Sequence, residues 1–274
     1  MKKYDLHTHT EQSHDSLTSP ENACLGAIKN GLDGIAFTDH CDVEFSEETD
    51  VITPIKRSVK AAEEMRLKFG NMLEVFSGVE IGEGLWHADT DSEVLNACAY
   101  DEVIRSVHAV RYKNHEKPYS AIDFSDWSDE KIRDYLKTYF SDLKETLKTL
   151  DGDIAAHITC PLRYIAGKYG KSVDMSVFKN DTDEILKTII SRGYALEINT
   201  SNLVCGGSGI LMPDKQIISR YRELNGELIT LGSDAHVPEN SGIKFDEIIT
   251  MLKATGFSRL YKYEKRKPVA TEIN

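Results

Sequence analysis

Residues 34–40 read GIAFTDH, a short apolar run that stops at Asp39 and His40, two possible metal ligands. The first run of the chain, DLHTH at 5–9, ends in the same way. Five further short apolar runs, at 75–79, 103–107, 154–156, 194–196 and 228–233, stop in turn at Glu80, His108, His157, Glu197 and Asp234. Short apolar runs separated by helix-like segments predict parallel β-strands, here seven of them.

Helix signals fill the spaces between these runs. Ser19 is a predicted N-cap before Pro20, and Ser128 is a predicted N-cap for a long amphipathic helix. Asp181 and Glu184 resemble a capping box. The helices expected from these signals and from helix-forming composition span residues 20–31, 52–69, 128–150, 181–193, 213–224 and 245–252.

Alternating strands and helices predict an α/β fold with a parallel sheet, and two forms compete. A doubly wound open sheet would leave its edge strands too far apart to share a site. A closed barrel brings all carboxyl ends together on one face, where such folds carry their active sites. We therefore predict a distorted, TIM-like (β/α)7 barrel forming a single domain over residues 1–274. The tail at 260–263 is either an eighth edge strand or a cover for the outside.

Composition excludes several classes of function. The net charge of −12 disfavours long nucleic acids and membrane surfaces as partners. No apolar stretch approaches the roughly 20 residues that span a bilayer, and the N-terminus shows no signal peptide. The five cysteines are scattered and form no CxxC pair, which favours free thiols and a cytoplasmic location.

The side chains at the strand ends form a set that suits metal ions. Imidazoles and carboxylates without thiolates favour zinc, iron or manganese. Eight or nine donors are too many for one ion, so two or three divalent metal ions are expected, with Glu80 as a bridge. Two neighbouring ions can share a water molecule, lower its pKa and clamp a phosphoryl group. The expected ligands from this pattern are His7, His9, His40, Glu80, His108, His157, Asp234 and His236.

The segments DLHTHT at 5–10, FTDH at 37–40, GVE at 78–80, SVH at 106–108, AH at 156–157 and GSDAH at 232–236 together resemble the polymerase-and-histidinol-phosphatase (PHP) superfamily. The segments at 32–40 and 196–201 are most similar to monofunctional L-histidinol-phosphate phosphatases. This resemblance implies a (β/α)7 barrel, in agreement with the strand count. It also implies hydrolysis of L-histidinol phosphate to L-histidinol and phosphate, and a place in histidine biosynthesis.

The resemblance further implies how the ligands divide among three ions. The first ion would be held by His7, His9, Glu80 and Asp234, and the second by Glu80, His108 and His157. The third would be held by His40, His236 and one residue of the segment 13–16. Asp15 is preferred there because family members often carry an acidic residue at this point, and His14 is the alternative.

The hypothesis for the reaction is attack on phosphorus by a hydroxide that bridges two ions. Asp234 could relay a proton, and His236 or a bound water could protonate the leaving group. Arg163 is the preferred clamp for the phosphate and Arg111 the second choice. The loops at 109–127 and 201–212 are expected on the catalytic face, where they could cover a small phosphorylated substrate.

The sequence leaves open which substrate is cleaved and whether the protein is catalytic at all. Residues 202–207 contain no basic side chain, although similar phosphatases often carry an arginine there, so another small phosphomonoester stays open. A nucleotide or phosphodiester, or an amidohydrolase reaction, are further alternatives. A metal-dependent binding module without catalysis is the non-enzymatic one.

Overall fold

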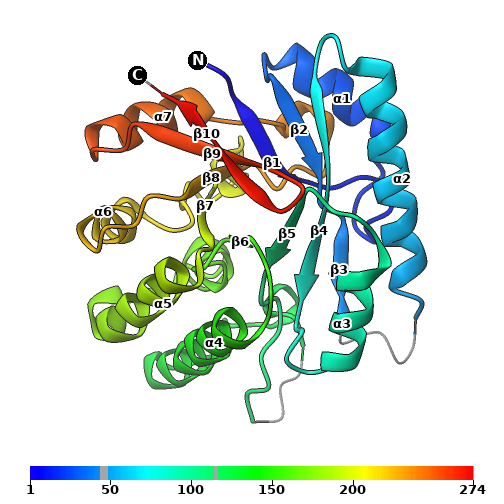
Figure 1. The fold of residues 1–274 in the computed structure, drawn as a ribbon. Helices are drawn as coiled ribbons and strands as arrows, with labels where there is room; N and C mark the ends of the chain where they lie inside the picture. The colour runs from blue at the N-terminus through cyan, green and yellow to red at the C-terminus, as the bar shows by residue number, and fades with distance from the viewer. Residues whose placement is uncertain (44–48, 114–116, 274) are drawn as a thin grey trace.

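Seven parallel strands form a nearly closed barrel in the part of the chain that the computed structural model describes, residues 1–43, 49–113 and 117–273. They follow one another around the barrel in chain order. The strands are β1 (Tyr4–Thr8), β2 (Gly34–Phe37), β4 (Glu74–Gly82), β5 (Glu102–Arg105), β6 (Ile154–Ala155), β7 (Ala195–Asn199) and β8 (Ile229–Gly232). Figure 1 shows them at the centre, with α1, α2 and α3 on one side and α4 to α7 on the other.

The barrel closes where the segment after β8 meets the end of β1. Asp234 N donates to His7 O at 2.7 Å, and His9 N donates to Ala235 O at 2.9 Å. These bonds join the last strand to the first, so the carboxyl ends of all the strands share one rim. The predicted seven-stranded barrel is therefore confirmed, and the open doubly wound sheet is excluded.

The second apolar run differs from the prediction because it breaks before its ligands. β2 ends at Phe37. A separate strand, β3 (His40–Asp42), pairs with the carboxyl-terminal end of β4. In that register His40 lies opposite Glu80. β4 itself does not stop at Glu80 but continues to Gly82. The extension of β4 gives β3 a partner, so His40 is fixed by a strand and not by a loose loop end.

The helices follow the predicted segments closely. α1 (Pro20–Lys29), α2 (Ile52–Phe69), α4 (Asp129–Thr149), α6 (Lys215–Glu223) and α7 (Phe245–Ala254) all lie where they were expected. Ser19 and Ser128 cap α1 and α4, accepting hydrogen bonds from Asn22 N and Lys131 N. On α4, the apolar side chains that repeat at three- and four-residue spacing are buried, each burial contributing roughly 1.5–3 kcal/mol; they are Ile132, Tyr135, Leu136, Tyr139, Phe140, Leu143 and Leu147.

Two helices depart from the sequence-based expectation. α5 (Lys179–Arg192) begins before the predicted capping box at Asp181, because the short 3₁₀ helix η4 (Met175–Phe178) leads directly into it. The capping-box prediction is therefore wrong, although Gly193 ends the helix at a φ of +76° as expected. α3 (Ala88–Ala97) was not predicted, because its polar sequence carries little apolar periodicity.

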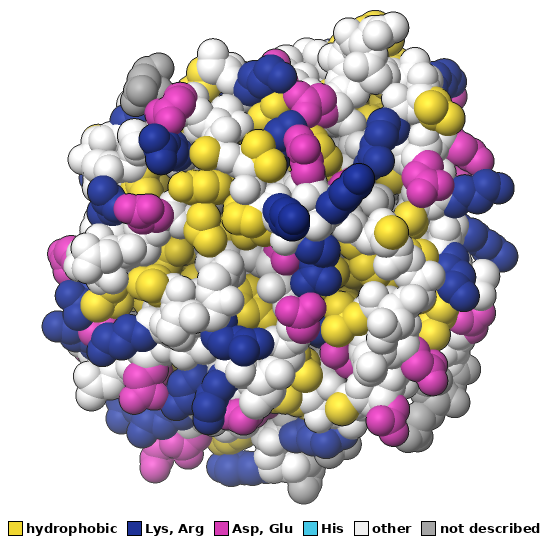
Figure 2. Space-filling model, viewed as in Figure 1, with side chains coloured by type: hydrophobic (Ala, Val, Ile, Leu, Met, Phe, Trp, Pro, Cys, Tyr) yellow, Lys and Arg dark blue, Asp and Glu magenta, His cyan; other side chains and the backbone are white. Residues whose placement is uncertain are grey.

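A hairpin covers the amino-terminal end of the barrel. β9 (Arg259–Glu264) and β10 (Lys267–Glu272) pair antiparallel to each other in a sheet of their own. Tyr263 Oη donates to Asp153 O at 3.0 Å, and Lys265 N donates to the Asp101 carboxylate at 3.1 Å. The tail is thus a cover and not an eighth strand. Figure 2 shows this face of the molecule, which mixes Lys and Arg with Asp and Glu and presents no histidine.

Apolar side chains from the strands fill the space between the hairpin and the opposite rim. This cluster includes Leu6, Ala36, Phe76, Ile104, Ile154 and Tyr263. The polar residues at the strand ends therefore lie next to a packed layer of apolar side chains. Among the described residues, no helix is both long and apolar enough to cross a membrane.

Candidate metal centre

A cavity of about 210 Å³ opens at the carboxyl-terminal rim of the barrel. Donor side chains from the ends of several strands line it. Those on its surface are His14, Asp15, His40, Asp42, His108, His157, Asp234 and His236. The remaining predicted ligands, His7, His9 and Glu80, lie buried directly beneath.

Glu80 stands at the centre of these side chains and is completely buried. One of its oxygens, Oε1, lies 2.9 Å from His157 Nε2 and 3.2 Å from His108 Nε2. The other, Oε2, lies 2.9 Å from His40 Nδ1 and 3.2 Å from His7 Nε2. Each carboxylate oxygen thus faces a different pair of imidazoles, which is the arrangement expected of a bridging carboxylate.

The first donor group gathers around the closing seam of the barrel. His9 Nε2 lies 3.2 Å from Asp234 Oδ1 and 3.7 Å from Glu80 Oε2, and His7 Nε2 lies 4.0 Å from Asp234 Oδ1. The register of β1 against β2 shifts between Asp5 and Thr8. An irregularity of this kind re-aims side chains, and here it accompanies the convergence of His7 and His9 on one site.

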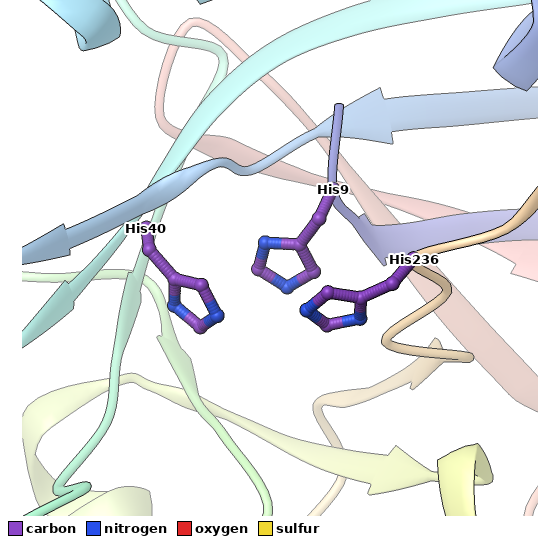
Figure 3. A group of neighbouring side chains, drawn as sticks. All are labelled: His9, His40 and His236. Atoms are coloured by element: carbon purple, nitrogen blue, oxygen red, sulfur yellow. The ribbon is translucent and has the colours of Figure 1, made fainter. Parts of the chain in front are cut away.

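A further group consists of three histidines from distant segments. Figure 3 shows His9, His40 and His236 facing a common space, and their donor atoms all lie within 4.8 Å of one another. Asp15 Oδ2 lies 3.0 Å from His236 Nε2 and 3.6 Å from His40 Nε2. The side chain of His14 is 66% exposed. Asp15 therefore contacts this histidine group directly, whereas His14 also lines the cavity, with its ring centre 5.5 Å from that of His40.

Most of the histidines that surround Glu80 have a second partner, which lies on the side of the imidazole that faces away from the other donors. This partner contacts Nδ1 and leaves Nε2 directed at the other donors, as is usual for metal-binding histidines. The pairs are His7 with Glu197 at 2.5 Å, His9 with Ser13 Oγ at 3.0 Å, His108 with Asp42 at 3.0 Å, and His236 with Asp234 O at 2.9 Å.

The donor atoms themselves lack hydrogen-bond partners although they are buried. Among the described residues this holds for His7 Nε2, His9 Nε2, His40 Nδ1, His236 Nε2 and Glu80 Oε2. Buried polar atoms are normally satisfied, so a converging group of unsatisfied ones needs an occupant. Donors about 2.1 Å from a tetrahedral ion would be about 3.4 Å apart, close to the spacings around Glu80. The residues therefore fit divalent metal ions.

The backbone at the rim is strained at two of these residues. His157 has a φ of +26° and Asp234 a φ of +51°, in the region that non-glycine residues seldom adopt. Such conformations cost on the order of 1–3 kcal/mol each and cluster at functional sites. Both residues carry donor atoms, so the strain coincides with the positions that place a ligand.

The charges around Glu80 favour the ionised form of its carboxylate. Burial disfavours the carboxylate of Glu80, but His7, His108 and His40 outweigh it and hold the pKa of Glu80 well below its usual range. Burial and the neighbouring His40 lower the pKa of His9 to about 3, which keeps this imidazole neutral. The ionised Glu80 and the neutral His9 are in the forms that bind metal ions. Neighbouring carboxylates raise the pKa values of His7, His40 and His108 against the effect of burial, so a metal ion binding there would displace protons.

The two arginines singled out from the sequence lie in different places. Arg163, at the start of η3 (Arg163–Lys168), lines the cavity, with its Nη1 3.9 Å from Asp234 Oδ2. Arg111 instead stacks on Trp86, its guanidinium 4.4 Å from the ring centre, and does not line the cavity. The structure thus brings Arg163 to the predicted metal ligands and does not bring Arg111 there.

The two long loops contribute unequally. Pro118, Tyr119 and Ser120, around the short helix η2 (Tyr119–Ala121), line the cavity as expected for the loop at 109–127. Residues 114–116 of that loop, including His115, lie outside the described residues. The loop at 201–212 is represented near the site by Ser201, in η5 (Ser201–Leu203), whose Oγ accepts from Arg163 at 3.4 Å.

Three residues at the site were not among the predicted ligands. Asp42 and Ser13 orient His108 and His9, and Glu197 orients His7. For Glu197 the signal was present, because it ends an apolar run as the ligands do. Asp42 lies two residues after His40, on the same side of a strand, a signal that becomes visible only once β3 is known to be a strand.

Comparison with known proteins agrees with this geometry. The model of the PHP domain matches residues 5–201. A probable histidinol-phosphatase of Clostridium acetobutylicum is 30% identical over 270 residues, covering 96% of this chain and 97% of the relative. The histidinol-phosphatase of Lactococcus lactis is 26% identical over 270 residues, covering 97% of this chain and 96% of that protein.

Solved structures show the same fold. The histidinol phosphate phosphatase of Lactococcus lactis, complexed with zinc, L-histidinol and phosphate, has a TM-score of 0.79 at 23% identity and covers 98% of this chain and 99% of its own. A putative histidinol phosphatase of Listeria monocytogenes has a TM-score of 0.75 at 21% identity, covering 89% and 99%. With the family model matched over most of the chain and its relatives aligned almost end to end, the chain belongs to the PHP domain family.

Proposed function

We propose that this chain is a metal-dependent phosphomonoesterase that hydrolyses L-histidinol phosphate to L-histidinol and inorganic phosphate. The observation that carries the proposal is Glu80, whose two oxygens face separate pairs of imidazoles in a ring of unsatisfied donors. The relatives that align over the full chain are named histidinol-phosphatases, and this supports the choice of substrate.

We divide the proposed ligands into three sets, one for each ion. One ion would be held by His7, His9, Glu80 and Asp234, a second by Glu80, His108 and His157, and a third by Asp15, His40 and His236. Bound ions would supply Lewis acidity to the phosphoryl oxygens and acidify a water molecule. Zinc, present in the Lactococcus lactis structure, is the first choice, with iron and manganese as alternatives.

The chain's own residues would bind and orient the substrate. Arg163 points into the cavity beside Asp234, where its guanidinium can pair with a phosphate dianion. Tyr119 and Tyr164 have ring centres 5.4 Å apart and form an apolar wall that limits access of water. Asp234 or His236 would move a proton to the leaving alcohol, and the location of both side chains in the cavity lining supports this role.

The size of the cavity favours a small substrate. About 210 Å³ accommodates a compact phosphomonoester and leaves little room for a nucleic acid strand. A different small phosphomonoester is the second candidate, because residues 202–207 offer no basic side chain to the substrate.

A substrate screen on metal-analysed protein tests the proposal. The purified chain is stripped with a chelator, reloaded separately with Zn²⁺, Fe²⁺ or Mn²⁺, and assayed against histidinol phosphate, other small phosphomonoesters and a diester. We expect histidinol phosphate to give the highest kcat/KM, with two or three ions per chain. Preference for another monoester would reject the substrate, and metal binding without turnover of any ester would favour a binding module.

A further inference from the structure

Glu197 contacts two of the proposed metal ligands without reaching the cavity. It is buried in the middle of β7 and does not line the cavity. Its Oε1 lies 2.5 Å from His7 Nδ1, and its Oε2 accepts a hydrogen bond from His157 N at 2.7 Å. Asn199 Nδ2 donates to the same Oε2 at 3.2 Å. One carboxylate therefore connects two histidines that face different oxygens of Glu80.

The barrel makes specific room for this carboxylate. Gly232, in the neighbouring strand β8, has no side chain where a Cβ would lie 2.1 Å from Glu197 Oε1 and 2.7 Å from His7 Cβ. Any larger residue at this position would collide with the pair. The contact between Glu197 and His7 thus depends on a glycine whose φ is otherwise unremarkable, which indicates that space and not backbone freedom selects it.

The two contacts act on different features of the two histidines. At His7 the carboxylate is positioned to accept a hydrogen bond from Nδ1, which would leave Nε2, 3.2 Å from Glu80 Oε2, free to bind a metal ion. At His157 it holds the backbone N–H, and so supports the residue with a φ of +26°. The position of His157 Nε2 beside Glu80 Oε1 follows from that strained backbone.

We infer that Glu197 is a positioning residue that fixes the spacing between two metal positions by holding His7 and His157 at the same time. The inference rests on the metal centre of the proposed function, and it is independent of which substrate is cleaved. Glu197→Gln keeps the size of the side chain but removes its charge, and an amide cannot accept on both sides.

Glu102 provides a matched control on another strand. It lies in β5, is also completely buried, and neither of its carboxylate oxygens has a hydrogen-bond partner. Like Glu197 it is a buried glutamate inside the barrel, but burial and the nearby Asp153 raise its pKa well above the usual range, and it makes no hydrogen bond to a histidine of the site. A general structural role for buried barrel carboxylates would affect both variants, whereas a role at the metals would affect only Glu197→Gln.

The test measures metal binding directly. Metal-free wild type, Glu197→Gln and Glu102→Gln are titrated with Zn²⁺ against a competing chelator, and their Co²⁺ absorption spectra are compared. We expect Glu197→Gln to lose at least about tenfold in affinity at one site and to change its Co²⁺ spectrum, while Glu102→Gln matches wild type in both. Wild-type affinity and spectrum in folded Glu197→Gln would overturn the inference.

A measurement on wild type covers the case in which Glu197→Gln fails to fold. In the zinc-loaded protein, ¹⁵N-edited NMR of the histidine rings should show the His7 Nδ1 proton at low field and slow to exchange with solvent, because it is hydrogen-bonded to the Glu197 carboxylate. A His7 Nδ1 proton that is neither shifted to low field nor protected from exchange would overturn the inference. Because neither measurement uses an ester, a wild type that binds zinc but does not cleave histidinol phosphate would reject the proposed function and leave the role of Glu197 standing.

Discussion

At the scale of single residues, Glu80 unites the donor groups because its two oxygens face in different directions. Glu80→Gln should reduce kcat/KM at least about 100-fold, since loss of a shared ligand costs more than loss of an orienting partner. The amide retains the volume of the side chain, so the circular dichroism spectrum should not change. Metal content by elemental analysis should fall in the same sample.

His14→Ala is the control for that variant, because the side chain of His14 is 66% exposed and stands next to Asp15 in the chain. It should retain the metal content and the turnover of wild type. Full turnover by metal-depleted Glu80→Gln would contradict the bridging role. Loss of one ion in His14→Ala would instead move the third site from Asp15 to His14.

The two arginines allow a second comparison at this scale. Arg163→Ala should raise KM for a phosphomonoester by roughly 10- to 100-fold, the effect of losing a charge-assisted contact of about 1.5–3 kcal/mol. Arg111→Ala should change KM less than about twofold, because Arg111 stacks on Trp86 outside the cavity lining. Steady-state kinetics at equal metal content would decide. The reverse order of effects would place the phosphate near Arg111.

At the scale of elements, the loop after β1 depends on the break between β2 and β3. Asp39 lies in that break and accepts hydrogen bonds from Thr10 N at 2.6 Å, Thr10 Oγ1 at 2.8 Å, Ser13 Oγ at 2.8 Å and Ser58 Oγ at 2.5 Å. The loop it holds carries Asp15 towards His236. One carboxylate thus ties the loop to the strand and to α2.

Asp39→Asn should therefore loosen this loop, because an amide offers one acceptor oxygen where four donors converge. We expect a loss of about 2–4 kcal/mol in the free energy of unfolding. Amide hydrogen exchange in residues 10–18 should be faster. Asp33→Asn is the control, since Asp33 accepts from Lys3 N at the opposite end of β2. Unchanged exchange in Asp39→Asn would show that other contacts hold the loop.

The sequence predicted the elements well where a periodic pattern or a cap was present, as in α1, α2 and α4. It failed where the structure depends on partners far away in the chain. The extension of β4 to Gly82 and the strand β3 stabilise each other, and neither has a local signal. Most of the proposed ligands were predictable because they follow short apolar runs, whereas Asp15 was expected only from the family resemblance. Asp42 and Ser13 were not, because their contacts arise only when the barrel closes.

At the scale of the whole molecule, the carboxyl end of the barrel carries the proposed metal site, whereas the amino end contributes to stability. The carboxyl rim carries the strained backbone of His157 and Asp234 and the converging unsatisfied donors, whereas the amino end is covered by β9 and β10. This division is common in barrels of parallel strands. Changes at the hairpin end should consequently alter stability without altering metal affinity.

Asp153 provides a test of that division through pH. It accepts hydrogen bonds from Val103 N at 2.7 Å and from Arg266 of the hairpin. Burial raises the pKa of Asp153 to about 6 against the attraction of Arg266. Between its ordinary pKa of 3.8 and 6, the folded chain binds more protons at this residue than the unfolded chain does. Raising the pH across that interval therefore removes stability.

The expected result is a difference between wild type and Asp153→Asn that changes with pH. On going from pH 4 to pH 7, metal-free wild type should lose up to about 3 kcal/mol of unfolding free energy relative to the variant. Asp151→Asn, which removes an exposed partner of the same Arg266, should show a much smaller slope because exposed charges are screened. Urea denaturation across this pH range measures both. A flat difference for Asp153→Asn, or weakened zinc binding in it, would mean that the two ends of the barrel are not separate.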